Sequence, residues 1–149
     1  MLKQIKIIFT LYVFIFSSGV FASAAFTTLD GQQISMQSLK GKWVLINYWA
    51  SWCQPCIKEI PHLNRFATLY KEKARLFAVN FDNASLGEQK TQEQQFQIQY
   101  TSLQSDPAKS LAFGDVNAVP VTFVLNPEGK LVKTLYGPQS LRSLEEAIR

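Results

Sequence analysis

The chain has 149 residues, of which 47% are hydrophobic and 17% are charged, with 15 Lys and Arg against 11 Asp and Glu and a formal charge of +4. This length fits one domain, and the hydrophobic content excludes a disordered or collagen-like chain. Two cysteines and one histidine exclude a zinc site built from four cysteines or from two cysteines and two histidines. The charge is small and has no Lys/Arg cluster behind it, so nucleic acid is not an expected partner.

The first two dozen residues differ in kind from the rest. Two lysines precede an apolar run over residues 7–16, and the small-x-small sequence Ala22-Ser23-Ala24 follows. A basic start, an apolar stretch and a small-residue site are the three parts of a secretory signal peptide. We therefore predict a signal peptide at 1–24, cleaved after Ala24, and an exported, periplasmic domain at 25–149. Retention of the leader as a membrane anchor is the alternative.

Hydrophobic periodicity after the leader predicts alternating strands and helices. The parallel strands come first and an antiparallel hairpin comes last, which is typical of an α/β domain with a helix-covered sheet. In chain order, we expect a small hairpin around Asp30-Gly31, a strand at 43–49, a helix at 55–73, a strand at 76–81, a helix at 88–100, a short extended piece at 102–103, a helical turn at 107–113, strands at 121–126 and 130–136, and a helix at 140–149.

Both cysteines fall in Trp52-Cys53-Gln54-Pro55-Cys56, where the strand at 43–49 ends and the helix at 55–73 begins. A cysteine at a helix N-terminus has a lowered pKa, because the backbone N–H groups and the helix dipole stabilise its thiolate. Cys53 is therefore the expected attacking thiol and Cys56 the resolving one. A structural disulfide is disfavoured because so small a loop constrains the unfolded chain little. A Cu(I)-binding thiol carrier remains as an alternative.

The segment from Asn47 to Cys56, followed by Glu59-Ile60-Pro61, resembles the active-site segment of the thioredoxin superfamily. It is most similar to the exported TlpA/ResA-like branch, which includes the cytochrome c maturation thioredoxins. The segment Val119-Pro120-Val121 resembles that family's segment around its cis-proline. The resemblance implies an α/β thioredoxin fold with a central mixed sheet flanked by helices. It also implies an added helix and short strand, in residues 83–115, between the cysteine helix and the cis-proline strand.

The resemblance also implies roles for further residues. Pro120 would be cis and lie against the disulfide, leaving the Val119 backbone free to pair with an extended substrate segment. Trp52 would shape the surface beside Cys53. Glu59, one turn beyond Cys56, would assist proton transfer at the cysteines as a third catalytic residue. A solvated Glu59 with no such role is the alternative.

These observations predict an exported thiol–disulfide oxidoreductase that needs no bound cofactor or metal and uses the Cys53–Cys56 disulfide as its redox centre. The intervening Gln54-Pro55 adds no positive charge, which favours the reducing direction; an oxidising disulfide-exchange protein is the alternative. The resemblance implies disulfide-bearing exported proteins as partners, apocytochrome c first among them, and a membrane thiol donor. Classical thioredoxins carry a buried Asp where this chain has Asn47, which moves proton handling toward Glu59.

Overall fold

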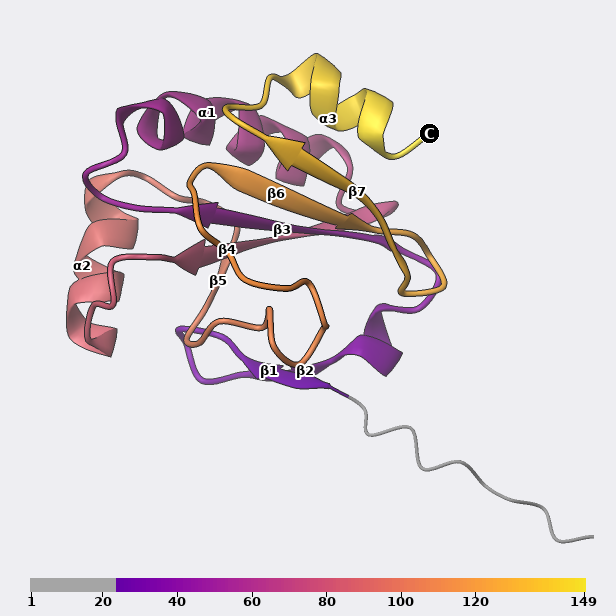
Figure 1. Cartoon of the computed structure of the whole chain (residues 1–149), viewed down its shortest axis with the longest axis horizontal. Helices are drawn as coiled ribbons and strands as arrows, with labels where there is room; N and C mark the ends of the chain where they lie inside the picture. The colour runs from indigo at the N-terminus through magenta and orange to yellow at the C-terminus, as the bar shows by residue number, and fades with distance from the viewer. Residues whose placement is uncertain (1–23) are drawn as a thin grey trace, which may run out of the picture.

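Strands and helices alternate along residues 24–149, the part of the chain that the computed structural model describes (Figure 1). The predicted signal peptide lies outside these residues, apart from Ala24 at its end. The elements in chain order are β1 (Ala25–Thr27), β2 (Gln33–Ser35), the 3-10 helix η1 (Met36–Leu39), β3 (Trp43–Trp49), α1 (Gln54–Leu69), β4 (Ala74–Asn80), α2 (Leu86–Gln95), β5 (Thr101–Leu103), β6 (Val121–Leu125), β7 (Leu131–Tyr136) and α3 (Leu141–Ala147).

Five strands form the central sheet in the order β5-β4-β3-β6-β7. The neighbours β3, β4 and β5 run parallel, whereas β6 is antiparallel to both β3 and β7. The sheet is therefore mixed, as predicted. Its central strand β3 is buried from Val44 onward, which agrees with the nearly continuous apolar sequence of that segment. The remaining two strands, β1 and β2, form the small antiparallel hairpin expected around Asp30-Gly31.

The two faces of the sheet are covered differently. Helices α1 and α3 pack together on one face, over Leu45 and Leu76, and contribute Leu63, Phe66 and Leu144 to that core (Figure 1). The opposite face, which bears the alternate side chains of β3 and β4, packs against the β1–β2 hairpin, η1 and the irregular segment 104–119. Within residues 24–149, no helix combines the length and the apolar character that crossing a membrane requires.

Helix α1 begins where predicted and ends earlier than the expected residue 73. Its N-cap is Cys53, whose sulfur accepts a hydrogen bond from the Cys56 N–H, and Pro55 occupies the first turn. The helix ends because the carbonyl of Tyr70 accepts from the N–H groups of Lys73 and Ala74, which turns the chain into β4.

Helix α2 is also displaced from its predicted range of 88–100. It begins earlier because Ser85 and Glu88 form a reciprocal capping box. It ends before Gln97, which has a left-handed backbone with φ of 55°. Tyr100 therefore precedes β5 in irregular chain, where its ring is buried. Residues 107–113 form only an isolated turn, closed by hydrogen bonds such as that from the Leu111 N–H to the Pro107 carbonyl (2.9 Å).

Candidate functional site

The cysteines lie where the sequence places them, between the end of β3 and the first turn of α1. Cys53 and Cys56 form a disulfide. The backbone N–H of Cys56 donates to the Cys53 sulfur over 3.3 Å. Cys53 is 4% exposed and Cys56 is fully buried, so Cys53 is the more accessible of the two residues. In the reduced protein, we expect the same N–H and the helix N-terminus to stabilise a thiolate at Cys53.

The Val119–Pro120 peptide bond is cis, which confirms the expectation from the resemblance. Pro120 directly precedes β6, whose first residue, Val121, pairs with Tyr48 near the end of β3. The carbonyl of Pro120 accepts from the N–H of Gly137, just after β7. The cis bond and the disulfide thus lie at the same end of the sheet. Pro120 is buried and Val119 is half-buried.

Two tryptophans flank the active-site loop in different environments. Trp52, directly before Cys53, is 66% exposed. Trp49 is buried and its ring packs edge-on against Phe96. Trp49 therefore belongs to the core. Trp52 presents a large apolar surface directly before Cys53 in the chain.

Glu59 is buried, with only 1% of its surface exposed, so the solvated alternative is wrong. Its Oε1 accepts from Asn47 Nδ2 (2.8 Å) and its Oε2 accepts from the backbone N–H of Gln139 (2.6 Å). Burial raises the pKa of Glu59 to about 7, although these two hydrogen bonds act in the opposite direction. The carboxyl group therefore changes its protonation state near neutral pH.

The polar cluster around Glu59 includes residues that the sequence does not single out. Asn47 Nδ2 also donates to Thr122 Oγ1 (3.0 Å), and the Tyr100 hydroxyl donates to Asn47 Oδ1 (3.4 Å). Thr122 is one residue beyond Val121, so its place beside β3 follows from strand pairing. Gln139 contributes a backbone N–H, which carries no signal in the side-chain sequence.

Asp82 is a further residue that sequence reasoning missed. Its Oδ2 accepts from the backbone N–H of Ser51 (2.9 Å), in the loop that leads to Cys53. Its Oδ1 is buried and has no hydrogen-bond partner among residues 24–149. Asp82 follows the end of β4, and parallel strands bring their carboxyl ends to the same end of a sheet. That topology is the signal that could have identified it.

The Redoxin family profile matches residues 17–148. The chain belongs to the Redoxin family. A thiol-disulfide oxidoreductase ResA of Bacillus cereus is 32% identical over 120 residues, which are 80% of this chain and 69% of that protein. ResA of Bacillus subtilis (strain 168) is 36% identical over 114 residues, 72% of this chain and 60% of that protein. A thioredoxin-family thiol:disulfide interchange protein from Chlorobium tepidum TLS has a similar crystal structure, with a TM-score of 0.70 and 26% identity over 85% of this chain and 90% of that one.

Membership of this family confirms three predictions. The fold is that of thioredoxin, the protein is a thiol–disulfide oxidoreductase of the ResA type, and the Cys53–Cys56 disulfide is its redox centre. The enzyme interpretation therefore prevails over a Cu(I)-binding carrier. Within residues 24–149, no cluster of three or more His, Cys, Asp or Glu side chains is arranged to hold a metal ion.

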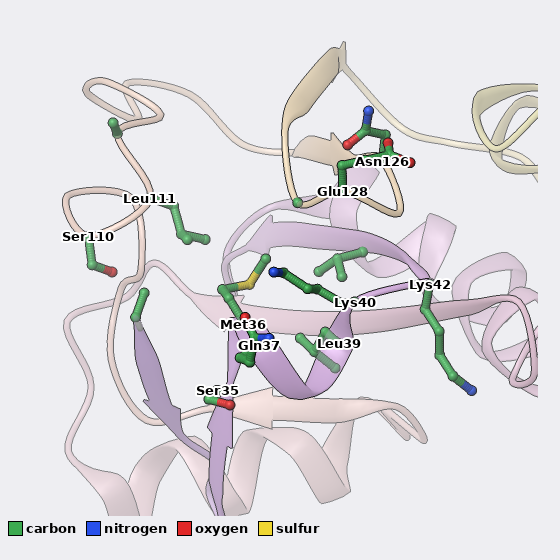
Figure 2. A pocket seen from close by; sticks show the side chains of 14 residues that line it. Ser35, Met36, Gln37, Leu39, Lys40, Lys42, Ser110, Leu111, Asn126 and Glu128 are labelled. Carbon is green, nitrogen blue, oxygen red and sulfur yellow. The ribbon is translucent and has the colours of Figure 1, made fainter. Parts of the chain in front are cut away.

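Residues 24–149 also form a pocket that includes neither cysteine; Figure 2 shows the side chains that line it. It is lined by η1, by the turn at 107–113 and by the turn between β6 and β7, with Met36, Lys40 and Glu128 among its residues. It also includes Lys42 and Val44, at the beginning of β3, whereas the cysteines follow the end of that strand. The redox centre therefore lies at the other end of the sheet, outside this pocket.

Proposed function

We propose that this protein is an exported reductase of disulfides in other exported proteins, with apocytochrome c as the leading substrate class. A membrane thiol donor returns electrons to it. The observation that supports the proposal most strongly is the buried carboxyl group of Glu59, which has a pKa of about 7 and lies on α1 one turn beyond Cys56. A group that ionises near neutral pH one helical turn from a cysteine thiol is suited to proton exchange with it.

The reaction begins with Cys53 in the reduced protein. Its thiolate attacks one sulfur of a substrate disulfide, which forms a mixed disulfide and releases the other substrate sulfur as a thiolate. The hydrogen bond from the Cys56 N–H to the Cys53 sulfur and the position of Cys53 as N-cap of α1 both favour this thiolate. The greater accessibility of Cys53 supports its role as the attacking residue.

The second step requires Cys56 to lose a proton. Glu59 in its carboxylate form accepts that proton, directly or through a water molecule. The Cys56 thiolate then attacks the Cys53 sulfur, which closes the Cys53–Cys56 disulfide and releases the second substrate sulfur. Two electrons have passed from the protein to the substrate, whose two thiolates take protons from the solvent, so that it leaves as a dithiol. The membrane donor reverses the exchange at Cys53, and Glu59 returns its proton to Cys56.

Substrate contact is assigned to Trp52, Val119 and Pro120. Trp52 offers an exposed apolar surface next to Cys53, and the half-buried Val119 precedes β6 at the same end of the sheet. An extended substrate segment that pairs with the Val119 backbone would be bound largely irrespective of its side chains. The absence of added positive charge in Gln54-Pro55 supports the reducing direction. Export is supported by the sequence pattern of residues 1–24.

Trapping tests this proposal. The full-length Cys56→Ser variant is reduced, mixed with apocytochrome c whose two cysteines form a disulfide, and analysed without reductant. We expect a mixed disulfide between Cys53 and apocytochrome c, because a serine in place of Cys56 cannot resolve it. Dithiothreitol should reduce this disulfide and release the two proteins. Cys53→Ser is the matched control and should trap nothing. Failure of Cys56→Ser to trap any disulfide-bearing protein above that control would contradict the assigned roles. Trapping of another exported protein but not apocytochrome c would reject only the substrate class.

A further inference from the structure

We infer that Tyr100 is a positioning residue for the redox site, because its hydroxyl holds the Asn47 amide with Nδ2 facing Glu59. Tyr100 lies between α2 and β5, in the segment that the resemblance implies as an addition to the fold. It is 6% exposed, and its hydroxyl donates to Asn47 Oδ1 over 3.4 Å. The inference rests on the proposed role of Glu59 and assigns a function to the added segment.

The Asn47 amide is fully engaged in this orientation. Its Nδ2 donates to Glu59 Oε1 and to Thr122 Oγ1, and its Oδ1 accepts from Tyr100. Half a turn of the amide would place Oδ1 against Glu59 Oε1, so two acceptors would meet unless Glu59 were protonated. The same rotation would turn an NH2 group toward the Tyr100 hydroxyl, whose proton would lose its acceptor. Tyr100 therefore favours the orientation that stabilises the Glu59 carboxylate.

Among the contacts of Glu59, the Asn47 amide is the group whose rotation can change the stability of the carboxylate. The Gln139 N–H that donates to Oε2 belongs to the backbone, so it cannot be reversed by a side-chain rotation. The groups that β3, β6 and the segment before α3 contribute to the cluster are neutral: Asn47, Thr122 and Gln139. The titratable groups are Tyr100 and, three residues before Glu59 on its own helix, Cys56 in its reduced form. No cation is among these contacts of Glu59, so its ionisation depends on hydrogen bonds and burial.

The substitution Tyr100→Phe tests this role with little change in packing. The aromatic ring, which belongs to the core on the α1 face, stays, and only the hydroxyl is removed. Without it, the Asn47 amide can rotate and the Glu59 carboxylate loses support. We expect the pKa of Glu59 to rise by about half a pH unit, since one long neutral hydrogen bond is lost. The readout is the carboxyl 13C chemical shift of Glu59 against pH in the oxidised protein.

Tyr70→Phe is the matched control. Its hydroxyl also donates to a side chain, Glu145 Oε1 (3.0 Å), but that contact links the C-cap of α1 to α3 and does not involve Asn47. We expect Tyr70→Phe to leave the Glu59 titration unchanged. Equal titration curves for the Tyr100→Phe and Tyr70→Phe variants would overturn the inference, provided that both proteins are folded, which the remaining NMR signals show.

The pathway through Asn47 is tested by a double-mutant cycle. In an Asn47→Ala background, Tyr100→Phe should cause no further shift, because the amide through which it acts is absent. A shift of undiminished size would overturn the inference. The proposed function fails by a different measurement: if Glu59→Gln leaves the pH profile of thiol alkylation in the reduced protein unchanged, Glu59 takes no part in the chemistry. The titration of Glu59 in the oxidised protein can be measured whether or not Glu59 takes part in the chemistry.

Discussion

The buried carboxyl group of Glu59 makes the stability of the protein depend on pH in a defined direction. Its pKa is about 7 in the folded protein against an ordinary value of 4.5. The folded protein therefore binds this proton more tightly than the unfolded chain does, so protonation stabilises the fold. This contribution is complete below about pH 4.5 and is lost as the pH rises through about 7.

The size of the effect follows from the same two values. A difference of about 2.5 pH units corresponds to about 3 kcal/mol in the free energy of unfolding. In Glu59→Gln this dependence disappears, because an amide does not titrate. The amide also places an NH2 group against one of the two donors, Asn47 Nδ2 or the Gln139 N–H. That mismatch lowers stability by a similar amount at every pH. The quantity to measure is therefore the difference in the free energy of unfolding between the wild type and Glu59→Gln, and how this difference varies with pH.

Urea unfolding of the oxidised wild type and Glu59→Gln at intervals from pH 4 to pH 9 measures this difference. Other titrating groups are common to both proteins and cancel. From pH 4 to pH 9, the free energy of unfolding of Glu59→Gln should rise by about 3 kcal/mol relative to that of the wild type. Most of this rise should fall between pH 5 and pH 7. A difference that stays constant across the range would refute the argument, because it would mean that Glu59 titrates alike in the folded and unfolded states.

Two further predictions concern the loop before Cys53. Trp52→Ala should change the free energy of unfolding by less than about 0.5 kcal/mol, since the side chain is exposed. It should raise KM for a protein disulfide about fivefold and leave the reduction of a small disulfide unaffected; equal effects on both substrates would argue against a docking role. Asp82→Ala removes the acceptor of the Ser51 N–H and should slow thiol exchange about fivefold, whereas Asp82→Asn keeps an acceptor and should be near wild type. Stopped-flow reaction of the reduced proteins with an aromatic disulfide compares them, and equal rates for the two Asp82 variants would exclude the positioning effect.

The parts of the site that depend on local sequence could be predicted. Cys53, Cys56 and Pro55 lie within a few residues of one another at a strand-to-helix junction, where apolar periodicity changes from a strand to a helix. Strand β3 was predicted with the bounds that the structure shows for the same reason, because its apolar sequence is long and nearly uninterrupted. The cis bond before Pro120 required the resemblance, since an isolated X-Pro sequence does not distinguish cis from trans.

The ends of the helices were predicted less well, because side-chain hydrogen bonds and backbone turns determine them. The predicted helix at 88–100 joined two segments with compatible periodicity. The structure separates them at Gln97, whose left-handed backbone no composition rule requires. The start of α2 was predictable in principle, since Ser85 and Glu88 have the spacing of a capping box.

The environment of Glu59 illustrates what sequence reasoning alone leaves open. Its position one turn beyond Cys56 was compatible with a solvated or a buried carboxyl group, and the two alternatives imply opposite chemistry. The choice depends on Asn47 from β3 and on a backbone N–H of Gln139, which is 80 residues away along the chain. Only the packing of α1 and α3 on one face of the sheet brings these groups together. The burial that raises the pKa of this carboxyl group is thus a property of the tertiary fold, whereas the thiolate that we propose at Cys53 depends mainly on the local helix N-terminus.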